Sequence, residues 1–171
     1  VNVFANVGPV ADAGGPYDSL LGADLLLNGS GSSDPDGTSP VVYGWDVGGL
    51  DRFDVSSDIN PRLDFAAIEA GLCGGTCQPE VAYPVALKVT DQYGASAIDR
   101  STVTFHRDFN LTINPPSTIL NPGGAVTYRV GVVSDNGFTD PVHLSVGTLP
   151  AGVTAIFDTA DVRPGGSALL T

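Results

Sequence analysis

The sequence predicts an all-β protein that folds as two consecutive β-sandwiches. Glycine and proline are abundant, at 22 and 13 of 171 residues, whereas only 15% of the residues are charged. This composition is typical of a chain with many turns and few surface helices. A turn-rich acidic stretch, Asn28–Gly37, separates the apolar strand Leu25–Leu27 from the strand Val41–Asp46, which carries the single tryptophan. A strand, a long turn and a strand with a large aromatic residue together indicate a sandwich with an anchored core.

The first sandwich is predicted to span residues 6–107. Leu87 and Val89 alternate with polar residues, which predicts a strand with one buried and one solvated face. Gln92–Gly94 supplies a hairpin turn after that strand. Strands are expected near Ala11–Ala13, Asp24–Asn28, Val41–Asp46, Pro84–Asp91 and Ala97–His106. The long connection Val47–Tyr83 is expected to contain a short helix within Leu63–Leu72, ended by Gly71.

Four blocks of this first domain resemble one known family. They are Pro9–Tyr17, the Gly-Ser-Gly-Ser-Ser-Asp-Pro-Asp-Gly run at Gly29–Gly37, the Tyr-x-Trp-Asp pattern at Tyr43–Asp46, and Val85–Ser96. Together they resemble the PKD domain, an immunoglobulin-like β-sandwich first described in polycystin. The resemblance implies that Trp45 is buried between two sheets. It also implies an accessory unit of a secreted protein, because unrelated secreted proteins carry this domain.

The alternating pattern restarts at Asp108, and residues 108–171 resemble a second immunoglobulin-like module of secreted bacterial or archaeal proteins. Asp108–Ile113 alternates strictly between polar and apolar residues. Further strands are expected over Ala125–Val133 and Val142–Val146. Modules of this kind continue for two or three more strands, so the second sandwich is expected to lack its final strands. Either the sequence is truncated, or another chain supplies the missing strands.

Residues 1–5 are predicted to be the tail strand of an upstream repeat, or a linker. Val1–Phe4 alternates like a short strand and resembles Val103–Phe105, the last strand expected in the first domain. A frayed terminus is the alternative interpretation. The sequence begins in mid-pattern without a basic and apolar leader, which favours a processed or excised piece.

The charge balance excludes some classes of partner. The chain carries 19 acidic and 7 basic residues, for a formal net charge of −12. Such a surface repels phosphate backbones and anionic membranes, so nucleic-acid binding is not expected. No segment approaches the roughly twenty apolar residues that span a bilayer, so membrane insertion is not expected either. The balance suits calcium binding, solubility or a salt-adapted host, and composition does not separate these interpretations.

The two cysteines, Cys73 and Cys77, are expected to form a disulfide. They flank a Gly-Gly-Thr segment, and a disulfide across it requires an oxidising compartment, so an extracellular location is predicted. A zinc site is the alternative. It needs about four ligands, and the two histidines, His106 and His143, lie far apart in the sequence with no paired spacing.

The sequence favours a protein without catalytic activity of its own. Neither histidine lies near a recognisable nucleophile, and the sequence has no Gly-x-Ser-x-Gly elbow. Any catalytic domain is therefore expected outside this chain. Two Asn-x-Ser/Thr sequons, at Asn28 and Asn110, are weak candidates for glycosylation.

The acidic turn Asp34–Gly37 is the candidate metal site. Only Pro35 separates Asp34 from Asp36, and Gly37 allows a sharp turn, so both carboxylates can converge on a hard cation. Calcium takes 6–8 oxygen ligands, so two carboxylates are too few. On ligand count alone, a plain turn is favoured over a metal site.

The family resemblance supplies a third ligand. In some calcium-binding PKD-like domains, the asparagine of an Asn-x-x-Pro-Val-Ala segment joins the acidic loop at the metal, and Asn6–Ala11 matches that segment. The resemblance therefore implies a Ca²⁺ site made by Asn6, Asp34 and Asp36, with Asp91 as a weaker candidate. Some members carry a second calcium loop after the tryptophan. Here its middle ligands are replaced by glycine and leucine within Asp46–Asp54, so that site is expected to be lost.

The sequence thus favours a non-catalytic extracellular spacer or adhesion module of a secreted or cell-surface protein, stiffened by calcium. The expected partners are neighbouring domains of a longer chain or other copies of this chain. Two alternatives remain. One is an accessory domain that binds protein or polysaccharide for an extracellular hydrolase. The other is a subunit of a surface filament that exchanges terminal strands between copies.

Overall fold

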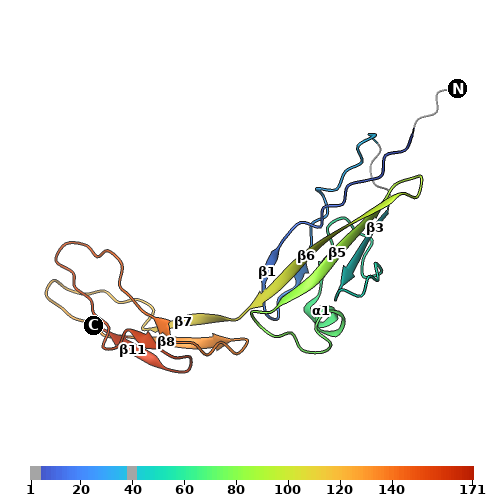
Figure 1. Cartoon of the computed structure of the whole chain (residues 1–171). Coiled ribbons are helices and arrows are strands. Elements are labelled where there is room, and N and C mark those ends of the chain that lie inside the picture. The colour runs from blue at the N-terminus through green and yellow to red at the C-terminus, as the bar shows by residue number, and fades with distance from the viewer. Residues whose placement is uncertain (1–4, 38–41) are drawn as a thin grey trace. The chain divides into compact units, whose positions relative to one another are not determined.

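The computed structural model describes residues 5–37 and 42–171. These residues are mostly β-structure with one short helix, so the all-β prediction is confirmed at that level. The chain divides into two compact units, Val1–His106 and Arg107–Thr171, and each has its own buried core (Figure 1). The strand predicted for Val1–Phe4 lies outside the described residues.

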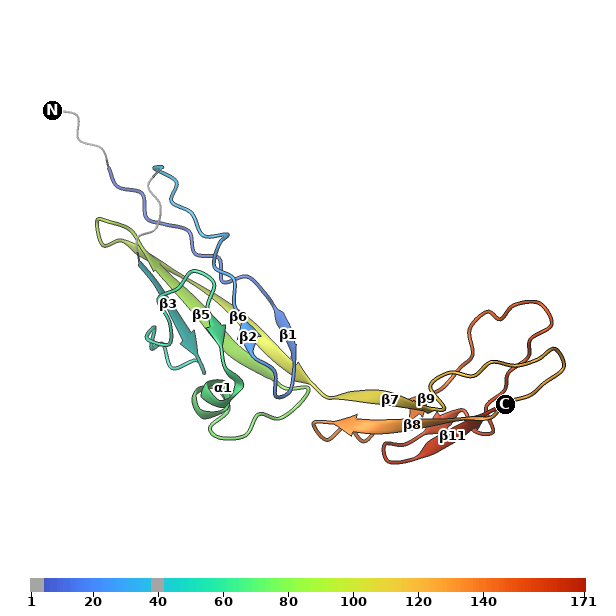
Figure 2. The same ribbon diagram turned by 180° about the vertical axis from the view of Figure 1, so that it is seen from behind.

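The first unit is built on a four-stranded sheet. Its strand order is β1 (Tyr17–Leu20), β6 (Ser96–His106), β5 (Ala82–Thr90) and β3 (Val42–Val47) (Figure 1). β1 runs parallel to β6, whereas β6, β5 and β3 are successive antiparallel neighbours. A separate antiparallel ladder joins β2 (Leu25–Leu26) to β4 (Arg62–Leu63); Figure 2 shows β2 beside β1.

The core of this unit joins the sheet to the segments that carry β2 and the helix. Trp45 on β3 lies opposite Leu87 on β5, and both side chains are fully buried against Leu27 and Phe105. The indole Nε1–H of Trp45 donates a hydrogen bond of 2.9 Å to the carbonyl of Asp58. Burying an indole stabilises the fold only if its N–H finds an acceptor, and Asp58 provides one. The prediction that Trp45 is a core residue is confirmed.

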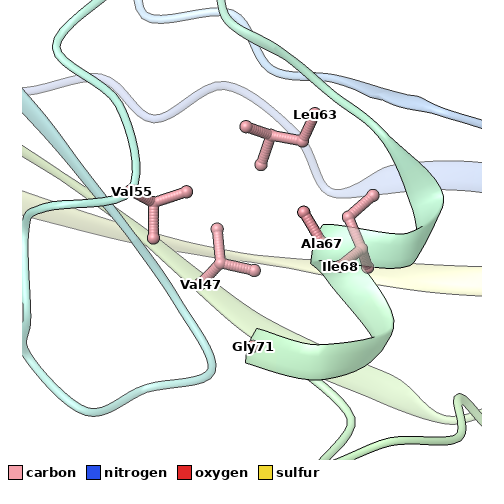
Figure 3. A pocket seen from close by; sticks show the side chains of 6 residues that line it. All are labelled: Val47, Val55, Leu63, Ala67, Ile68 and Gly71. Atoms are coloured by element: carbon pink, nitrogen blue, oxygen red, sulfur yellow. The ribbon is translucent and has the colours of Figure 1, made fainter.

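The predicted short helix is also confirmed, as α1 (Phe65–Gly71). Asp64 caps its first turn, because the side chain accepts a hydrogen bond of 3.0 Å from the Ala67 amide. Ile68 is the buried residue of the helix. A small apolar cavity of about 50 Å³ lies beside it (Figure 3), lined by Val47, Val55, Leu63, Ala67, Ile68 and Gly71. Ligand pockets usually enclose roughly 300–1,000 Å³, so this cavity is a packing gap.

The strand predicted at Ala11–Ala13 is wrong. In this stretch, side chains take the place of a neighbouring strand: the Asp12 amide donates to the Ser32 hydroxyl, and the Ala13 amide donates to the Asp99 carboxylate. Nearby backbone pairing is limited to an isolated bridge between Val10 and Ser33. Local side-chain acceptors compete with strand ladders in this way, and composition alone does not reveal them.

The second unit contains a three-stranded antiparallel sheet of order β11 (Ser167–Leu170), β8 (Tyr128–Asp135) and β7 (Asp108–Asn114). A two-residue ladder pairs β9 (Val142–His143) with β10 (Asp161–Val162). The core residues are Val130, Val132, Val142, Leu144, Val162 and Ala168.

Among the strands predicted for this unit, Asp108–Ile113 is confirmed as β7. The strand predicted at Ala125–Val133 begins later, at Tyr128, and ends at Asp135. The strand predicted at Val142–Val146 covers only Val142–His143.

Candidate functional site

The candidate site lies where the first described residues of the first unit meet its acidic turn. The leading segment, Asn6–Val10, passes between that turn and the β5–β6 hairpin. On one side, Val10 and Ser33 exchange backbone hydrogen bonds of 2.7 and 3.0 Å. On the other side, a Cβ placed on Gly8 would lie 3.5 Å from the Cβ of Ala95 in the hairpin. The leading segment therefore contacts both of the loops expected to supply ligands.

Asp91 is the central side chain of this region. It follows the last residue of β5, and it is only 3% exposed. Its carboxylate accepts three hydrogen bonds: 2.7 Å from the Asn6 side-chain amide, 2.8 Å from the Tyr93 amide and 2.9 Å from the Ala95 amide. The hydrogen bond from Asn6, with help from the backbone amides of the hairpin, lowers the pKa of Asp91, against the opposing effect of burial. Asp91 is therefore an anion held by neutral donors.

The acidic turn Asp34–Gly37 approaches the same segment. The Asp36 amide donates to Oδ1 of Asp34 at 3.2 Å, and the Gly37 amide donates to the Asp34 carbonyl at 3.2 Å. These bonds close the turn from inside, as expected for an Asp-Pro-Asp-Gly sequence. The Oδ2 atom of Asp36 accepts a hydrogen bond of 3.2 Å from the Val7 amide. Asp36 is thus fixed to the residue that follows Asn6.

The structure brings the predicted ligands into one neighbourhood but gives them different partners. Asn6 contacts Asp91, Asp36 contacts Val7, and Asp34 orients Asp36. Within residues 5–37 and 42–171, no three His, Cys, Asp or Glu side chains converge in a way that would hold a metal. The oxygen donors of Asp34 and Asp36 fit a hard cation by their chemistry, whereas three N–H donors already engage Asp91. The calcium site stays a prediction.

Asp91, the weaker ligand candidate in the sequence, is the side chain that binds Asn6. The sequence pattern that indicates this role is a strand followed by Asp-x-x-Gly-Ala, at Asp91–Ala95. In such a turn the aspartate carboxylate accepts hydrogen bonds from the backbone amides two and four residues later. Such a carboxylate has a fixed orientation. Its remaining oxygen was therefore available for Asn6.

In the loop after Trp45, the carboxylates of Asp46 and Asp51 have protein partners. Asp46 is buried, and its Oδ2 atom accepts a hydrogen bond of 2.9 Å from the Asp51 amide. The Asp51 carboxylate forms an ion pair of 2.8 Å with Arg100 on β6. Arg100 therefore neutralises one carboxylate of this loop, and the loss of the second calcium site stays a prediction.

His106 forms the other charged cluster of the first unit. Its Nδ1 lies 2.9 Å from Glu80 Oε2, and its Nε2 lies 2.9 Å from Asp18 Oδ1. The hydrogen bonds to Asp18 and Glu80 raise the pKa of His106. Carboxylates accept from both ring nitrogens only when both carry protons, so the arrangement favours the imidazolium form. The cluster ties β1 and β6 to the residues before β5.

Cys73 and Cys77 form the predicted disulfide. Cys77 is buried in the core of the first unit, and Cys73 packs against that core. No helix among the described residues has the length and apolar character needed to cross a membrane. No family model matches the sequence. The PKD resemblance therefore rests on the motifs of the first domain and stays a prediction.

Proposed function

We propose that this chain is a non-catalytic extracellular module of a secreted or cell-surface protein, with a PKD-like first unit that serves as a spacer or adhesion domain. The single observation that carries the proposal is the double attachment of the leading segment. Asn6 is bonded to the buried Asp91, and Val7 is bonded to Asp36. The chain that enters the unit is therefore held from its second described residue onward.

Such an attachment suits a spacer because a spacer must hold its neighbouring domains in a fixed orientation. A chain that enters through a loose segment can leave its domain at any angle, whereas two successive attached residues fix the direction of approach. The buried Pro9 restricts the backbone further. In this proposal the β-sheets of both units are immunoglobulin-like sandwiches, and neighbouring domains or other copies of the chain are the partners.

In this proposal, calcium strengthens the same attachment of Asn6 and Val7 to the first unit. Asp34 and Asp36 are the carboxylates that would hold the cation, with the side-chain oxygen of Asn6 as the third ligand. A bound cation supplies positive charge that links these oxygens. The residues themselves hold the turn closed and keep Asp36 beside Val7. The disulfide supports an extracellular location.

The attachment is tested by backbone ¹⁵N relaxation of the leading segment. We expect order parameters near 0.85, the rigid range, for the amides of Val7, Gly8 and Val10. Asn6→Ala should lower them, whereas Asn110→Ala, which removes an exposed asparagine of the second unit, should not. Values below about 0.6 in the wild-type chain would refute the attached joint.

Calcium is tested by calorimetric titration at up to millimolar concentration. We expect heat from the wild-type chain and none from Asp34→Ala/Asp36→Ala. The control Asp54→Ala/Asp58→Ala removes the same charge from an exposed stretch and should bind like wild type. Absence of heat from the wild-type chain refutes calcium, and equal heat from the Asp34 and Asp36 variant refutes this location.

A further inference from the structure

β7 is an open sheet edge, unlike the other terminal strands of the two main sheets. The outer edge of β11 is covered, because Ile156 and Thr171 exchange hydrogen bonds of 2.9 and 3.0 Å. The outer edge of β3 is covered in the same way, because Trp45 bonds to the segment Val55–Ser56. β1 is only four residues long. β7 has seven residues and pairs only with β8 among the described residues. Natural proteins usually shorten, charge or cover such an edge.

The backbone of β7 directs three residues toward this open edge. On β8, the Val132 amide donates to the Gly166 carbonyl at 3.1 Å, and the Val132 carbonyl accepts from Gly165 at 2.8 Å. Val132 therefore bonds toward β11. Leu111, its partner on β7, occupies a non-hydrogen-bonded pair with β8. The N–H and C=O of Leu111 consequently point to the open edge. By the alternation of an antiparallel ladder, so do those of Phe109 and Ile113. The Phe109 amide already donates a hydrogen bond of 2.8 Å to Asp108 Oδ1, so it must release that carboxylate before it can pair across the edge.

Apolar side chains of β7 lie on the same face of the sheet as the core residues of β8, but they are not buried. Leu111 lies opposite Val132, and Ile113 lies opposite Val130. Both valines are buried, whereas Leu111 is 54% exposed and Ile113 is 48% exposed. Two apolar side chains on the core-facing side of a sheet, next to unpaired backbone groups, indicate that another strand belongs beside them.

We propose that the strand beside β7 is β7 of a second copy, antiparallel to it about a two-fold axis at Leu111. The sequence Asp108–Asn114 reads the same in both directions as a polar and apolar pattern. In this register Leu111 lies opposite Leu111 of the second copy, and Phe109 lies opposite its Ile113. The three residues whose backbone groups point outward then pair with one another across the edge. If the two β7 strands shifted by one residue, outward-pointing backbone groups would no longer face each other. A shift by two residues would leave fewer of these facing pairs.

The charges along the edge itself do not oppose a second copy. In this register Asp108 lies opposite Asn114, so no like charges meet directly. The second unit contains three arginines and five aspartates, so it carries only −2 of the net charge of −12. The isologous arrangement closes after two copies, whereas strand exchange between chain termini would produce a filament. This inference does not depend on calcium or on the spacer function.

The interface is small, so the dimer is expected to be weak and to depend on concentration and salt. Pairing one strand of seven residues buries less than the roughly 1,200 Å² of a standard stable interface. The remaining charge of the two chains opposes association, and salt screens that repulsion. Sedimentation velocity of the intact chain should therefore show a monomer–dimer equilibrium that shifts toward dimer between 20 mM and 500 mM sodium chloride.

Leu111→Pro tests the edge. Proline removes an N–H that points outward and leaves the bonds to β8 in place, so the fold is retained. Two edge hydrogen bonds are lost in each dimer, and the dissociation constant should rise by about tenfold or more. The control Val133→Thr changes an exposed residue on the other face of the sheet and should leave association unchanged.

Leu111→Cys and Ile113→Cys test the register under oxidising conditions. Residues directly opposite in an antiparallel pair lie about 5.5 Å apart at Cα, within disulfide range. Leu111→Cys should therefore give a disulfide-linked dimer. In the same register the two copies of Ile113→Cys are offset by four residues, about 13 Å along the strand, and should stay unlinked. A wild-type chain that remains monomeric at millimolar concentration, open-ended oligomers, or equal cross-linking of both variants would each overturn the proposal.

Discussion

The side-chain amide of Asn6 donates a hydrogen bond of 2.7 Å to the carboxylate of Asp91, 85 residues further along the chain. This bond joins the first described residues of the first unit to the end of β5. Because Asp91 is almost fully buried, it has a fixed position and gives Asn6 a rigid partner.

Replacing Asp91 with asparagine should destabilise the first unit and remove one source of acid sensitivity. The pKa of Asp91 is lowered in the folded state, mainly by Asn6. A lowered pKa contributes stability that is present above the unfolded pKa of about 3.9 and is lost as the pH falls through the folded value. Urea unfolding from pH 7 to pH 2 should show this loss in the wild type and a shallower profile in Asp91→Asn. Identical profiles would contradict the assignment.

Asn6→Ala should move the pKa of Asp91 upward, toward that of an ordinary aspartate. The variant removes the largest influence on that pKa and leaves the two backbone donors in the hairpin. NMR titration of the Asp91 carboxyl carbon measures the shift directly. Asn110→Ala serves as the matched control. An unchanged Asp91 pKa in Asn6→Ala would show that the backbone amides alone hold it down.

Stability should also fall as the pH rises above about 6.5, because of His106. Its folded pKa is raised by Asp18 and Glu80. The contribution is therefore complete below the unfolded pKa of about 6.5 and disappears as the pH rises through the folded value. Urea midpoints between pH 5.5 and pH 9 should decline in the wild type and change less in His106→Gln. His143→Gln, which alters the other histidine, should retain the decline.

Gly71→Ala should stabilise the first unit by about 0.5–1 kcal/mol. Gly71 is the last residue of α1, its φ is not positive, and an added Cβ would meet nothing within 4 Å. Alanine therefore gains helix propensity and loses less chain entropy than glycine. Gly48→Ala is the opposing control: its φ is +113°, and its Cβ would lie 2.7 Å from the Gly71 carbonyl. Thermal unfolding should show opposite shifts, and a rise in both would contradict the local geometry.

Reduction of the disulfide should lower the stability of the first unit by about 2 kcal/mol or less and leave its fold intact. The bridge between Cys73 and Cys77 closes a small loop, so it restricts the unfolded chain only slightly. Circular dichroism and urea unfolding, with and without a reductant, measure both effects. Loss of the β-sheet signal on reduction would mean that the bridge holds the core around Cys77 together.

The sequence predicted the parts of the fold that depend on local pattern. Trp45 was identified as core because a single large aromatic residue lay on a strand after a turn. The helix at Phe65–Gly71 followed from apolar spacing. The false strand at Ala11–Ala13 arose because Ser32 and Asp99, distant in sequence, accept hydrogen bonds from its backbone. The Asn6–Asp91 bond and the identity of β7 as the open edge also depend on which segments become neighbours, and a pattern read along the chain does not show that.

The parallel pairing of β1 with β6 has a mechanical consequence. Tyr17–Leu20 is the first strand among the described residues of its unit, and it lies beside Val103–His106, the end of the last one. When opposite ends of the unit are pulled apart, two parallel neighbours slide along each other, so their hydrogen bonds bear the load together. Antiparallel neighbours pulled in this way would open one bond at a time. The first unit should therefore resist stretching more strongly than its stability to urea suggests, and single-molecule force measurements on the intact chain can detect that difference.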